Sequence, residues 1–462
     1  MTPDANDLCV FAIKRGYIEN REVYCNSLYP FYLSLIERYK NSPYASGIMR
    51  DYVYVNPKTD CSSLQDNDEV SFIPMPNVQE KNNSVHYDLV KYSSVKKGFT
   101  VFQRGDLIWA KITPCMQNGK SCIVDNMPTD IGFGSTEFHI IRKRNESIYM
   151  PYLWAIFSNE NVLKAAQATF SGSAGQQRVS ASFIESFPAI IPEYKKQIAI
   201  TVQLEKNLQL RKENYQSAQD LLNGMNEVIL SSLGISQAEY SERLVGAIQL
   251  SDLITDCTFS AEYYHPERIA SIRALKMHRG LTTKKLSEVV SFQRDTVISA
   301  ESKEIYLGLA GVESQTGELS GIVEEAAGQA FVYQVGDVLY GRLRPYLNKV
   351  IVAETSGICS TEFHVMRVID ENEIIPEYLA AIMRSPLILA QTKHMMTGNT
   401  HPRISNDDVK NLYIPIPEID VQREIASELN KRRKEARKLK EEAEQEWADA
   451  KAQFEKELLG VI

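Results

Sequence analysis

Residues 134–142 read GSTEFHIIR, and residues 359–367 read CSTEFHVMR. The five letters STEFH therefore occur twice, 225 positions apart, and each copy is followed by two apolar residues and an arginine. Strand alternation would place Phe138 and Ile140 on one face and Glu137 with His139 on the other. Such a pair of copies is typical of a repeated catalytic strand, a repeated metal site or a duplicated domain.

The similarity between the two halves extends far beyond these five letters. Six blocks recur in the same order, with offsets close to that of STEFH. A chance match of one strand cannot produce such an order, so we interpret the chain as a tandem duplication of a unit of roughly 200 residues. The paired blocks are 105–120 with 336–349, 134–142 with 359–367, 150–159 with 375–385, 170–180 with 396–405, 187–198 with 413–424, and 230–234 with 456–460.

Each unit has the pattern of a mixed α/β domain. GDLIWAKI and GDVLYGRL begin with a Gly-Asp turn and continue as alternating strands, and we expect all of STEFHIIR to be a strand. MPYLWAIFSN and IPEYLAAIM are typical of helix starts with proline in the first turn. GSAGQQRVS and GNTHPRIS are predicted loops. IIPE and PIPE are extended segments bracketed by proline, and they end the domain.

A long helix without internal proline follows each of these proline segments. Apolar residues recur at alternating steps of three and four, which is the pattern of a coiled-coil seam. Each helix of about 35 residues would extend roughly 50 Å and needs a partner helix, for which the other copy is the obvious candidate. The first seam is Leu204, Leu208, Tyr215, Ala218, Leu222, Met225 and Ile229, with Arg211 out of pattern; the second is Leu429, Ala436, Ala443, Trp447, Ala450 and Phe454, with Arg433 and Lys440 out of pattern.

The predicted fold class is therefore α+β, with two tandem mixed α/β domains separated by two long antiparallel coiled-coil helices. An approximate two-fold axis would relate the two domains. The predicted boundaries are 1–190 for the first domain, 191–234 for the first helix, 235–415 for the second domain and 416–462 for the second helix.

Composition indicates a soluble, cytoplasmic protein. Hydrophobic residues make up 44% of the 462 positions and charged residues 24%. No apolar run approaches the roughly 18 residues that span a bilayer, and the first residues lack the apolar core of a secretion signal. The seven cysteines form no CxxC pair, which argues against a zinc ribbon. The net charge is −8, but basic residues gather at 96–120 and 340–349, and a local field of this kind can serve a polyanion.

Three enzymatic or ligand-binding alternatives are disfavoured by the residues present. No Pro-Pro turn of the type that holds a flipped base occurs, which argues against a methyltransferase. TPCMQNGKS ends like a phosphate-binding loop, but Pro114 stands where the first glycine belongs and supplies no N–H. Glu137 and His139 are too few ligands for a metal site, so we expect a structural role: the glutamate pairs with an arginine or orients a loop, and the histidine is satisfied at the core edge.

The loops in which the two copies differ are the better candidates for function. Two modules at a fixed separation can read two half-sites of a DNA duplex, and arginine, lysine, glutamine and asparagine suit phosphates and base edges. Because Arg178 and Arg403 recur in both copies, they are better suited to structure or backbone contact than to base reading. The candidate DNA-binding residues are Lys111, Gln117, Asn118, Lys120, Gln176, Gln177, Arg178, Arg342, Arg344, Asn348, Lys349, Asn399, Thr400, His401 and Arg403.

The chain resembles the specificity subunit of type I restriction–modification enzymes. The resemblance rests on the GDxL blocks with their basic loops, STEFH, the loops that end in Arg-Val-Ser or Arg-Ile-Ser, the IPE segments with their long helices, and AEYYHPE at 261–267. It covers nearly all of the chain; only residues 1–26 and part of 50–90 match poorly.

The resemblance implies two target-recognition domains that read the halves of a bipartite site in double-stranded DNA. It also implies that the helices set the spacer and contact two methyltransferase (modification) subunits, and that the chain acts in antiphage defence. The chain itself would be non-catalytic and would hold no cofactor or metal. S-adenosylmethionine is expected on the methyltransferase partner, and ATP with Mg on a restriction and translocase subunit. The alternative is a coiled-coil protein-interaction scaffold without sequence-specific DNA binding.

Overall fold

The computed structural model describes residues 30–173, 176–236, 240, 260–299, 302, 304–326, 328–398 and 400–460. The chain divides into two compact units, one formed by Met1–Asn214 with Glu441–Ile462 and the other by Tyr215–Lys440. Each unit combines helices and sheets, so the predicted α+β class is confirmed. Each long helix is divided between the two units, whereas the predicted boundaries treat each helix as a segment of its own.

The first unit contains two four-stranded sheets. One has the order β2-β9-β6-β7 and is antiparallel; the other has the order β4-β3-β8-β5, in which β3 and β8 are parallel. A short pair, β1 with β10, joins the two ends of the domain. The elements are α1 (Pro30–Lys40), β1 (Ala45–Ile48), η3 (Met49–Asp51), β2 (Val53–Val55), β3 (Glu69–Ile73), η4 (Met75–Asn77), β4 (Asp88–Lys91), α2 (Tyr92–Val95), β5 (Thr100–Gln103), β6 (Leu107–Ala110), β7 (Ser121–Ile123), β8 (Ile131–Gly134), β9 (Phe138–Lys143), α3 (Met150–Phe157), α4 (Glu160–Gln167), α5 (Ala181–Ser186), β10 (Pro188–Ile190) and the start of α6 (Tyr194–Asn223).

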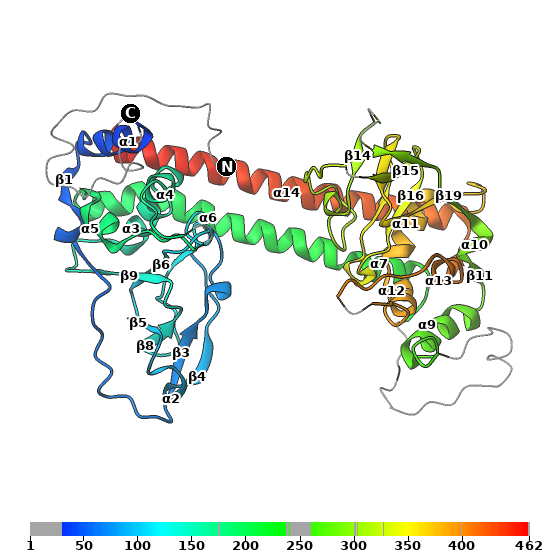
Figure 1. Cartoon of the computed structure of the whole chain (residues 1–462), viewed down its shortest axis with the longest axis horizontal. Coiled ribbons are helices and arrows are strands. Elements are labelled where there is room, and N and C mark those ends of the chain that lie inside the picture. Colours follow the sequence, from blue (N-terminus) through cyan, green and yellow to red (C-terminus); the bar gives the residue numbers. More distant parts are fainter. Residues whose placement is uncertain are drawn as a thin grey trace. The chain divides into compact units, whose positions relative to one another are not determined.

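The core of the first unit is layered, and strand alternation explains the layers. Leu107 and Trp109 of β6 face α3, α4 and the long helices, whereas Ile108 and Ala110 face the second sheet. In Figure 1 the sheet that contains β3, β4, β5 and β8 accordingly lies on the side away from α6. The first sheet is therefore the platform between the helices and the outer sheet.

The second unit repeats this plan. Its sheets have the orders β12-β19-β16-β17 and β13-β15-β18-β14, and β11 pairs with β20. Its elements are α7 (Met225–Ser232), α9 (Pro266–Met277), β11 (Thr282–Lys285), α10 (Leu286–Val289), β12 (Val290–Gln293), β13 (Thr296–Ile298), β14 (Tyr306–Leu307), η6 (Leu309–Gly311), β15 (Gln329–Tyr333), β16 (Val338–Gly341), η7 (Pro345–Leu347), β17 (Val350–Val352), β18 (Gly357–Ser360), β19 (Phe363–Val368), α11 (Pro376–Arg384), α12 (Pro386–Thr392), α13 (Asn406–Lys410), β20 (Tyr413–Ile416) and the start of α14 (Ile419–Leu459).

The two units differ at one sheet edge. The three strands β3, β8 and β5 correspond to β14, β18 and β15, and in both units the first two of these are parallel. In the first unit the fourth strand, β4, extends the sheet beside β3, whereas in the second unit β13 extends it beside β15. The duplicated platform is thus the same in both units, and the outer sheet has diverged.

The STEFH segment differs from the sequence prediction in its first half. Strand β9 begins at Phe138 and β19 at Phe363, and the residues before them form a turn. The Ser135 and Ser360 hydroxyl oxygens each accept a hydrogen bond, 3.2 Å long, from the N–H of the glutamate two residues on. A serine that bonds its neighbouring backbone competes with strand pairing, which explains why the strand that contains the histidine begins only at the phenylalanine.

A buried ion pair connects the Gly-Asp turn to the end of STEFHIIR in each unit. Arg142 donates to both carboxylate oxygens of Asp106 at 2.7 Å, and Arg367 donates to those of Asp337 at 2.7 and 2.8 Å. The two aspartates are 1% and 0% exposed. This pairing explains why an arginine follows STEFH and its apolar pair in both copies.

A buried glutamine joins each long helix to its domain. The Gln197 side chain accepts from the N–H of Tyr149 and donates to Ser147 and Pro192 carbonyls at 2.8 and 2.9 Å. Gln422 makes the equivalent bonds to Ile375, Glu373 and Pro417. These glutamines are fully buried and fully bonded, so they set the angle at which the helix leaves the proline segment.

The long helices pack against each other with opposite directions in the first unit. Asn207 of α6 donates to the Glu446 carbonyl of α14, and Arg211, one turn further, pairs with Glu444 at 2.6 Å. Arg211, which interrupts the apolar pattern, thus lies at the edge of the helix pair. The seam residues that are buried are Leu204, Leu208, Ala218, Met225 and Ile229, and Leu429, Ala436, Ala443, Trp447, Ala450 and Phe454; Leu222 is half-buried.

Two features of the first long helix differ from the simple heptad pattern. Tyr215, predicted in the seam, is 37% exposed. The helix is also interrupted at Gly224, between α6 and α7. A Cβ atom on Gly224 would lie 2.8 Å from Nη1 of Arg432, so a larger residue here would displace the end of that side chain.

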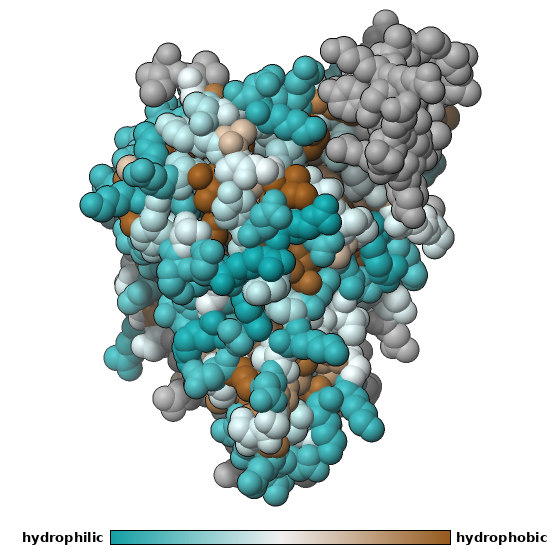
Figure 2. All heavy atoms as spheres, turned by 90° about the vertical axis from the view of Figure 1, so that its left-hand side faces the viewer, coloured by the Kyte–Doolittle hydropathy of each residue, from teal (hydrophilic) through white to brown (hydrophobic). Residues whose placement is uncertain are grey.

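The described part of the chain contains no helix with both the length and the apolar character that a membrane span requires. The face drawn in Figure 2 is largely hydrophilic, and hydrophobic residues show in separate places between polar ones.

We predict that Asp106→Asn lowers the free energy of unfolding by about 3 kcal/mol, because it leaves the Arg142 guanidinium, 17% exposed, without its charge partner. Asp337→Asn should act in the same direction in the second unit. Urea denaturation measures both. The control is Asp130→Asn, whose carboxylate is 91% exposed and should change stability by less than about 1 kcal/mol. Equal effects of Asp106→Asn and Asp130→Asn would contradict a structural role for the buried pair.

Candidate nucleic-acid interface

The glutamate of STEFH holds the glycine-rich loop of the first unit. Arg178 donates from Nε and Nη2 to the two oxygens of Glu137 at 2.8 and 2.7 Å, and its Nη1 donates to the Gln176 carbonyl at 2.8 Å. These bonds hold the pKa of the Glu137 carboxyl below its usual value, and they also raise the pKa of Arg178. One side chain therefore connects the strand platform with its own loop.

The second unit contains the same arrangement. Arg403 donates from Nη2 to Glu362 at 2.7 Å and from Nε at 3.0 and 3.1 Å, and its Nη1 donates to the His401 carbonyl at 3.2 Å. We call Glu137 with Arg178, and Glu362 with Arg403, the loop clamps. Of the roles that the sequence suggested for the glutamate, this geometry agrees with pairing to an arginine of the same domain. The clamps also explain why these two arginines recur in both copies.

Beside each clamp, backbone hydrogen bonds join two loops that are distant in the sequence. In the first unit the N–H groups of Thr113 and Val179 donate to the Gln177 and Lys111 carbonyls at 3.0 Å. In the second unit Arg344 donates through its N–H to Pro402 at 2.7 Å, and Ile404 to Arg342 at 3.0 Å. The basic loop and the glycine-rich loop are thus hydrogen-bonded neighbours in both units. The loop pairs are 111–120 with 171–178, and 342–349 with 397–403.

The STEFH histidines belong to the platform beneath these loops. His139 stacks on Trp109, contacts the Val179 carbonyl through Nε2 at 3.0 Å and approaches Asn56 Nδ2 at 3.1 Å. His364 stacks on Tyr340 in the same way. Burial lowers the pKa of both histidines, and that of His364 falls to about 4. Both imidazoles are therefore neutral at pH 7 and act as packing groups.

The two recurring lysines of the basic loops are bonded inside their domains. Lys120 Nζ donates to the Met75 carbonyl at 3.3 Å, and Lys349 Nζ donates to the Leu309 carbonyl at 2.9 Å. Each acceptor is the first residue of a short 3₁₀ helix, η4 or η6. Burial also lowers the pKa of Lys349. These lysines connect η4 and η6 to the platform sheet, whereas the sequence suggested that they contact DNA.

The structure also assigns internal partners to three of the predicted amides. Asn348 is 4% exposed and donates to the Arg384 carbonyl at 2.6 Å, so its burial removes it from the DNA-contact set. Asn118 donates to Glu80 at 2.8 Å, and Gln117 accepts from the Thr113 hydroxyl. Asn399 lies outside the described residues. The predicted side chains that remain after the clamp arginines, the two lysines and these amides are all exposed or partly exposed: Lys111, Gln176, Gln177, Arg342, Arg344, Thr400 and His401.

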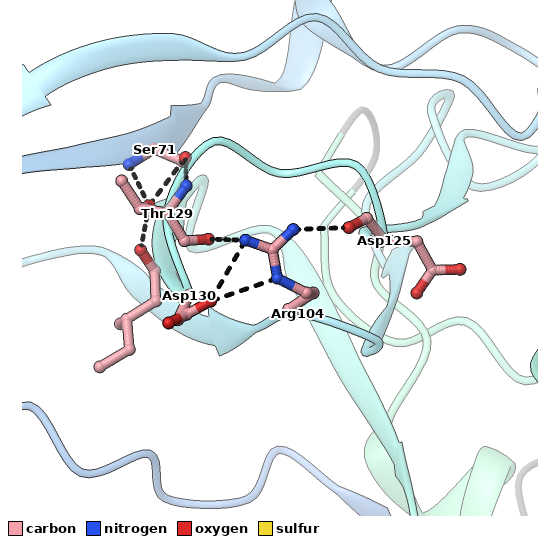
Figure 3. A network of polar contacts seen from close by, with 6 residues as sticks. Ser71, Arg104, Asp125, Thr129 and Asp130 are labelled. Atoms are coloured by element: carbon pink, nitrogen blue, oxygen red, sulfur yellow. Dashed lines mark hydrogen bonds and ion pairs between the residues drawn. The ribbon is translucent and has the colours of Figure 1, made fainter.

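Most of the basic run before Lys111 is neutralised by acids from other segments. Lys96 pairs with Asp66 at 2.9 Å. Figure 3 shows Arg104 between two segments: it donates to Asp130 at 3.2 Å and to the Asp125 carbonyl at 2.9 Å, while Thr129 bonds to Ser71. This run therefore supplies little unpaired positive charge. The candidate DNA-contact surface is limited to the two loop pairs.

One cluster outside the loops has metal-ligand chemistry. His265, Glu267 and His394 have ligand atoms within 4.8 Å of one another. The two imidazole rings, however, are stacked 3.5 Å apart at 12°, so their in-plane lone pairs converge poorly on one ion. Glu267 is already bonded to His394 at 2.8 Å and to Lys393 at 2.6 Å. We describe this cluster as a stacked pair that holds α9 against α12.

Sequence reasoning missed two residues that matter to this surface. Asn56, with a φ of 51°, donates its N–H to the Ile140 carbonyl, accepts the Ile140 N–H with its side-chain Oδ1 and contacts His139. It lies in the region without a recognisable repeat. Arg384 is 6% exposed at the end of α11 and supports Asn348. Its replacement of Ser158 in the aligned blocks is a signal that could have been used.

Comparisons with known proteins bear on the family that the chain resembles. Residues 281–446 match the family model described as type I restriction modification DNA specificity domain. The chain is 36% identical over 181 residues to the type I restriction enzyme EcoAI specificity subunit of Escherichia coli, covering 39% of this chain and 30% of that one. It is 30% identical over 224 residues to the EcoEI specificity subunit of the same organism, covering 48% and 36%.

A solved structure, a type I restriction-modification system S subunit from M. genitalium, is 12% identical, with a TM-score of 0.44 over 88% of this chain and 94% of that chain. The chain spans about a third of the length of the two curated relatives, which it matches over 30% and 36% of their lengths. The resemblance found in the repeated blocks is confirmed by this family match over residues 281–446 and by the similarity to the two specificity subunits.

We predict that acid destabilises the chain partly through His364. Its folded pKa of about 4 lies below the ordinary value near 6.5, so the stabilising contribution of the neutral ring is present above pH 6.5 and is lost as pH falls toward 4. Between pH 7 and 4.5 this loss amounts to about 2 to 3 kcal/mol. His364→Phe should remove that part of the loss in urea titrations, while His401→Phe, at an exposed position, should leave it in place. Equal losses in His364→Phe and wild type would refute the assignment.

Proposed function

We propose that the chain is the DNA-specificity subunit of a type I restriction–modification complex, and that each unit reads one half of a bipartite site. The observation that carries the proposal is the loop clamp, which holds a polar loop on the same platform in both units. The clamped loops differ in sequence, GSAGQQR in one unit and TGNTHPR in the other. Two different half-sites can be read by two units that hold their loops in the same way but present different polar side chains.

The structure reduces the set of residues proposed for DNA contact. Arg178 and Arg403 become positioning residues, because their guanidinium groups bind the clamp glutamates. The proposed contact set is Lys111, Gln176 and Gln177 in the first unit, and Arg342, Arg344, Thr400 and His401 in the second; Asn399 stays a sequence prediction. Arg344 is held for this role in a left-handed conformation, with a φ of 48°, and its Nη2 donates to the Thr400 carbonyl at 3.4 Å.

The long helices supply the remaining part of the proposed function. We propose that they set the separation of the half-sites and bind two modification subunits, on which S-adenosylmethionine is expected. ATP and Mg would belong to a restriction subunit, and the chain itself would carry out no catalysis. The relatives named EcoAI and EcoEI are specificity subunits, which supports this proposal over a scaffold without sequence-specific DNA binding.

We predict that exchange of one clamped loop changes one half of the methylated motif. Residues 397–403 are replaced by residues 171–178, and the variant is co-expressed with its modification subunit. Long-read sequencing of the host genome then maps methylation. The half-site of the second unit should change or disappear, and the other half should persist. The reciprocal exchange is the matched control and should alter the opposite half. A change in both halves of the motif within one variant would contradict the division of labour.

We also predict a steep salt dependence of DNA affinity. Each phosphate contact contributes about −0.9 to the slope of log affinity against log salt, so Arg344→Gln should reduce the slope by about one if it binds phosphate, or relax sequence preference if it reads a base. Lys195→Gln is the control, because this lysine is exposed at the start of α6, away from the loops. Fluorescence anisotropy of a labelled duplex measures both. Affinity that does not respond to salt would favour the scaffold alternative.

A further inference from the structure

The second unit contains a polar cavity of about 480 Å³ beside the long helices. It lies between the end of α6, α7, α11, α14 and residues 313–316, in a part of the unit that the clamped loops do not use. Its size is within the range of small-molecule sites. The lining residues are Gln219, Leu222, Asn223, Met225, Asn226, Ile229, Glu313, Ser314, Gln315, Thr316, Ala381, Arg384, Leu429, Arg433 and Lys440.

Three cations line this cavity. Arg384, 6% exposed, ends α11 and donates from Nη1 to the Val350 carbonyl at 2.6 Å. Arg433 and Lys440 come from α14 and are the two residues that interrupt the apolar seam of the second helix. The buried Nε of Arg433 has no hydrogen-bond partner among the described residues. Glu313, the only acid among the described lining residues, accepts from the Thr316 hydroxyl at 3.1 Å.

The electrostatics of this arrangement are unfavourable without an anion. Burial, and then the neighbouring Arg433, hold the pKa of Arg384 well below its usual range, and burial also lowers the pKa of Arg433. Arginine nevertheless keeps its charge in proteins, so two like charges share a poorly solvated space. Neither guanidinium has an ion pair with a described residue. Buried charges are ordinarily paired, and the missing partner here is negative.

The duplication provides an internal comparison. In the aligned helices Leu208 corresponds to Arg433, and Ser158 corresponds to Arg384. The first unit also has Trp154 stacked on Trp447, with ring centroids 6.4 Å apart, where the second unit has Ala380 and Leu222. The first unit thus has a tryptophan at the position of Leu222, which lines the cavity, and it has serine and leucine where the second unit has the two arginines. The cations are therefore not a requirement of the shared fold.

We propose that this cavity binds a phosphate group, as inorganic phosphate or as a small phosphate monoester. Three cations against one carboxylate leave a charge that matches a dianion. Arginine side chains bind phosphate oxygens in pairs, and the amides of Gln219, Asn223 and Asn226 offer further donors. A carboxylate has two oxygens and one charge, so it would leave more of these donors without an acceptor.

Inorganic phosphate is the probe that tests the proposal on the full chain. We expect saturable binding by isothermal titration calorimetry, and a rise in the melting temperature that chloride and acetate do not produce at equal ionic strength. Arg433→Leu, which introduces the residue found at the equivalent position of the first unit, should weaken phosphate binding at least tenfold. Lys434→Leu removes the same charge from an exposed position of the same helix and should bind as the wild type does.

The outcomes separate the possibilities. Equal melting temperatures in phosphate and chloride, or an equal response of Arg433→Leu and wild type, would overturn the proposal. A response to acetate as large as that to phosphate would show a carboxylate site and would also overturn it. If Arg433→Leu does not fold, as judged by circular dichroism, Lys440→Gln serves as the second variant with the same expectation. A phosphate response that saturating duplex DNA abolishes would place a DNA phosphate in the cavity and refute a small-molecule site.

Discussion

The pairing of the STEFH glutamate with the loop arginine is the interaction on which the proposed recognition surface depends. It joins a turn at the edge of the platform to a loop that is otherwise attached by few backbone bonds, and the third guanidinium nitrogen also bonds the loop itself. The geometry is bidentate, so the pair fixes orientation as well as distance. Stability of the fold rests elsewhere, on the buried Asp–Arg pairs and the layered core. The clamp serves the position of the loop rather than the stability of the domain.

The architecture could be predicted from sequence because each signal was local and repeated. The Gly-Asp turns, the helix prolines and the proline segments all lie where the structure has turns, helix starts and edge strands. The prediction failed where a side chain competed with the backbone. In Ser-Thr-Glu the serine hydroxyl accepts a hydrogen bond from the glutamate N–H, and the chain turns before the next strand begins. The sequence pattern of alternating apolar and polar residues does not show this turn. Tyr215 fits the heptad steps but is 37% exposed, because the steps along one helix do not show which positions the opposing helix covers.

The site was harder to predict because a sequence shows only which charged residues are neighbours along the chain. The structure shows which oppositely charged residues from distant segments pair with them. Lys96 and Arg104 lie in a basic run, yet Asp66 and Asp130 reach them from segments tens of residues away. Lys120 and Lys349 recur at the ends of the two basic loops, which suggested DNA contact, but their ammonium groups bond carbonyls of short helices. A residue that occurs at the same position of both copies belongs to the fold that the copies share. Such a residue is therefore a better candidate for a structural role than for a ligand contact.

Divergence between the copies is therefore the more informative signal. The two copies can differ only at positions on which neither the platform sheet nor the buried glutamine contacts of the long helices depend. The differences between the copies are found in three such places. They are the clamped loops, the edge strand of the outer sheet, and the space beside α11, where one copy has tryptophans and the other has arginines. Drift would favour apolar filling of a buried space, because an unpaired buried guanidinium is costly. The presence of Arg384 and Arg433 in such a space argues that an anion offsets that cost. The half-buried serine and the buried leucine at the same positions of the other copy need no such partner.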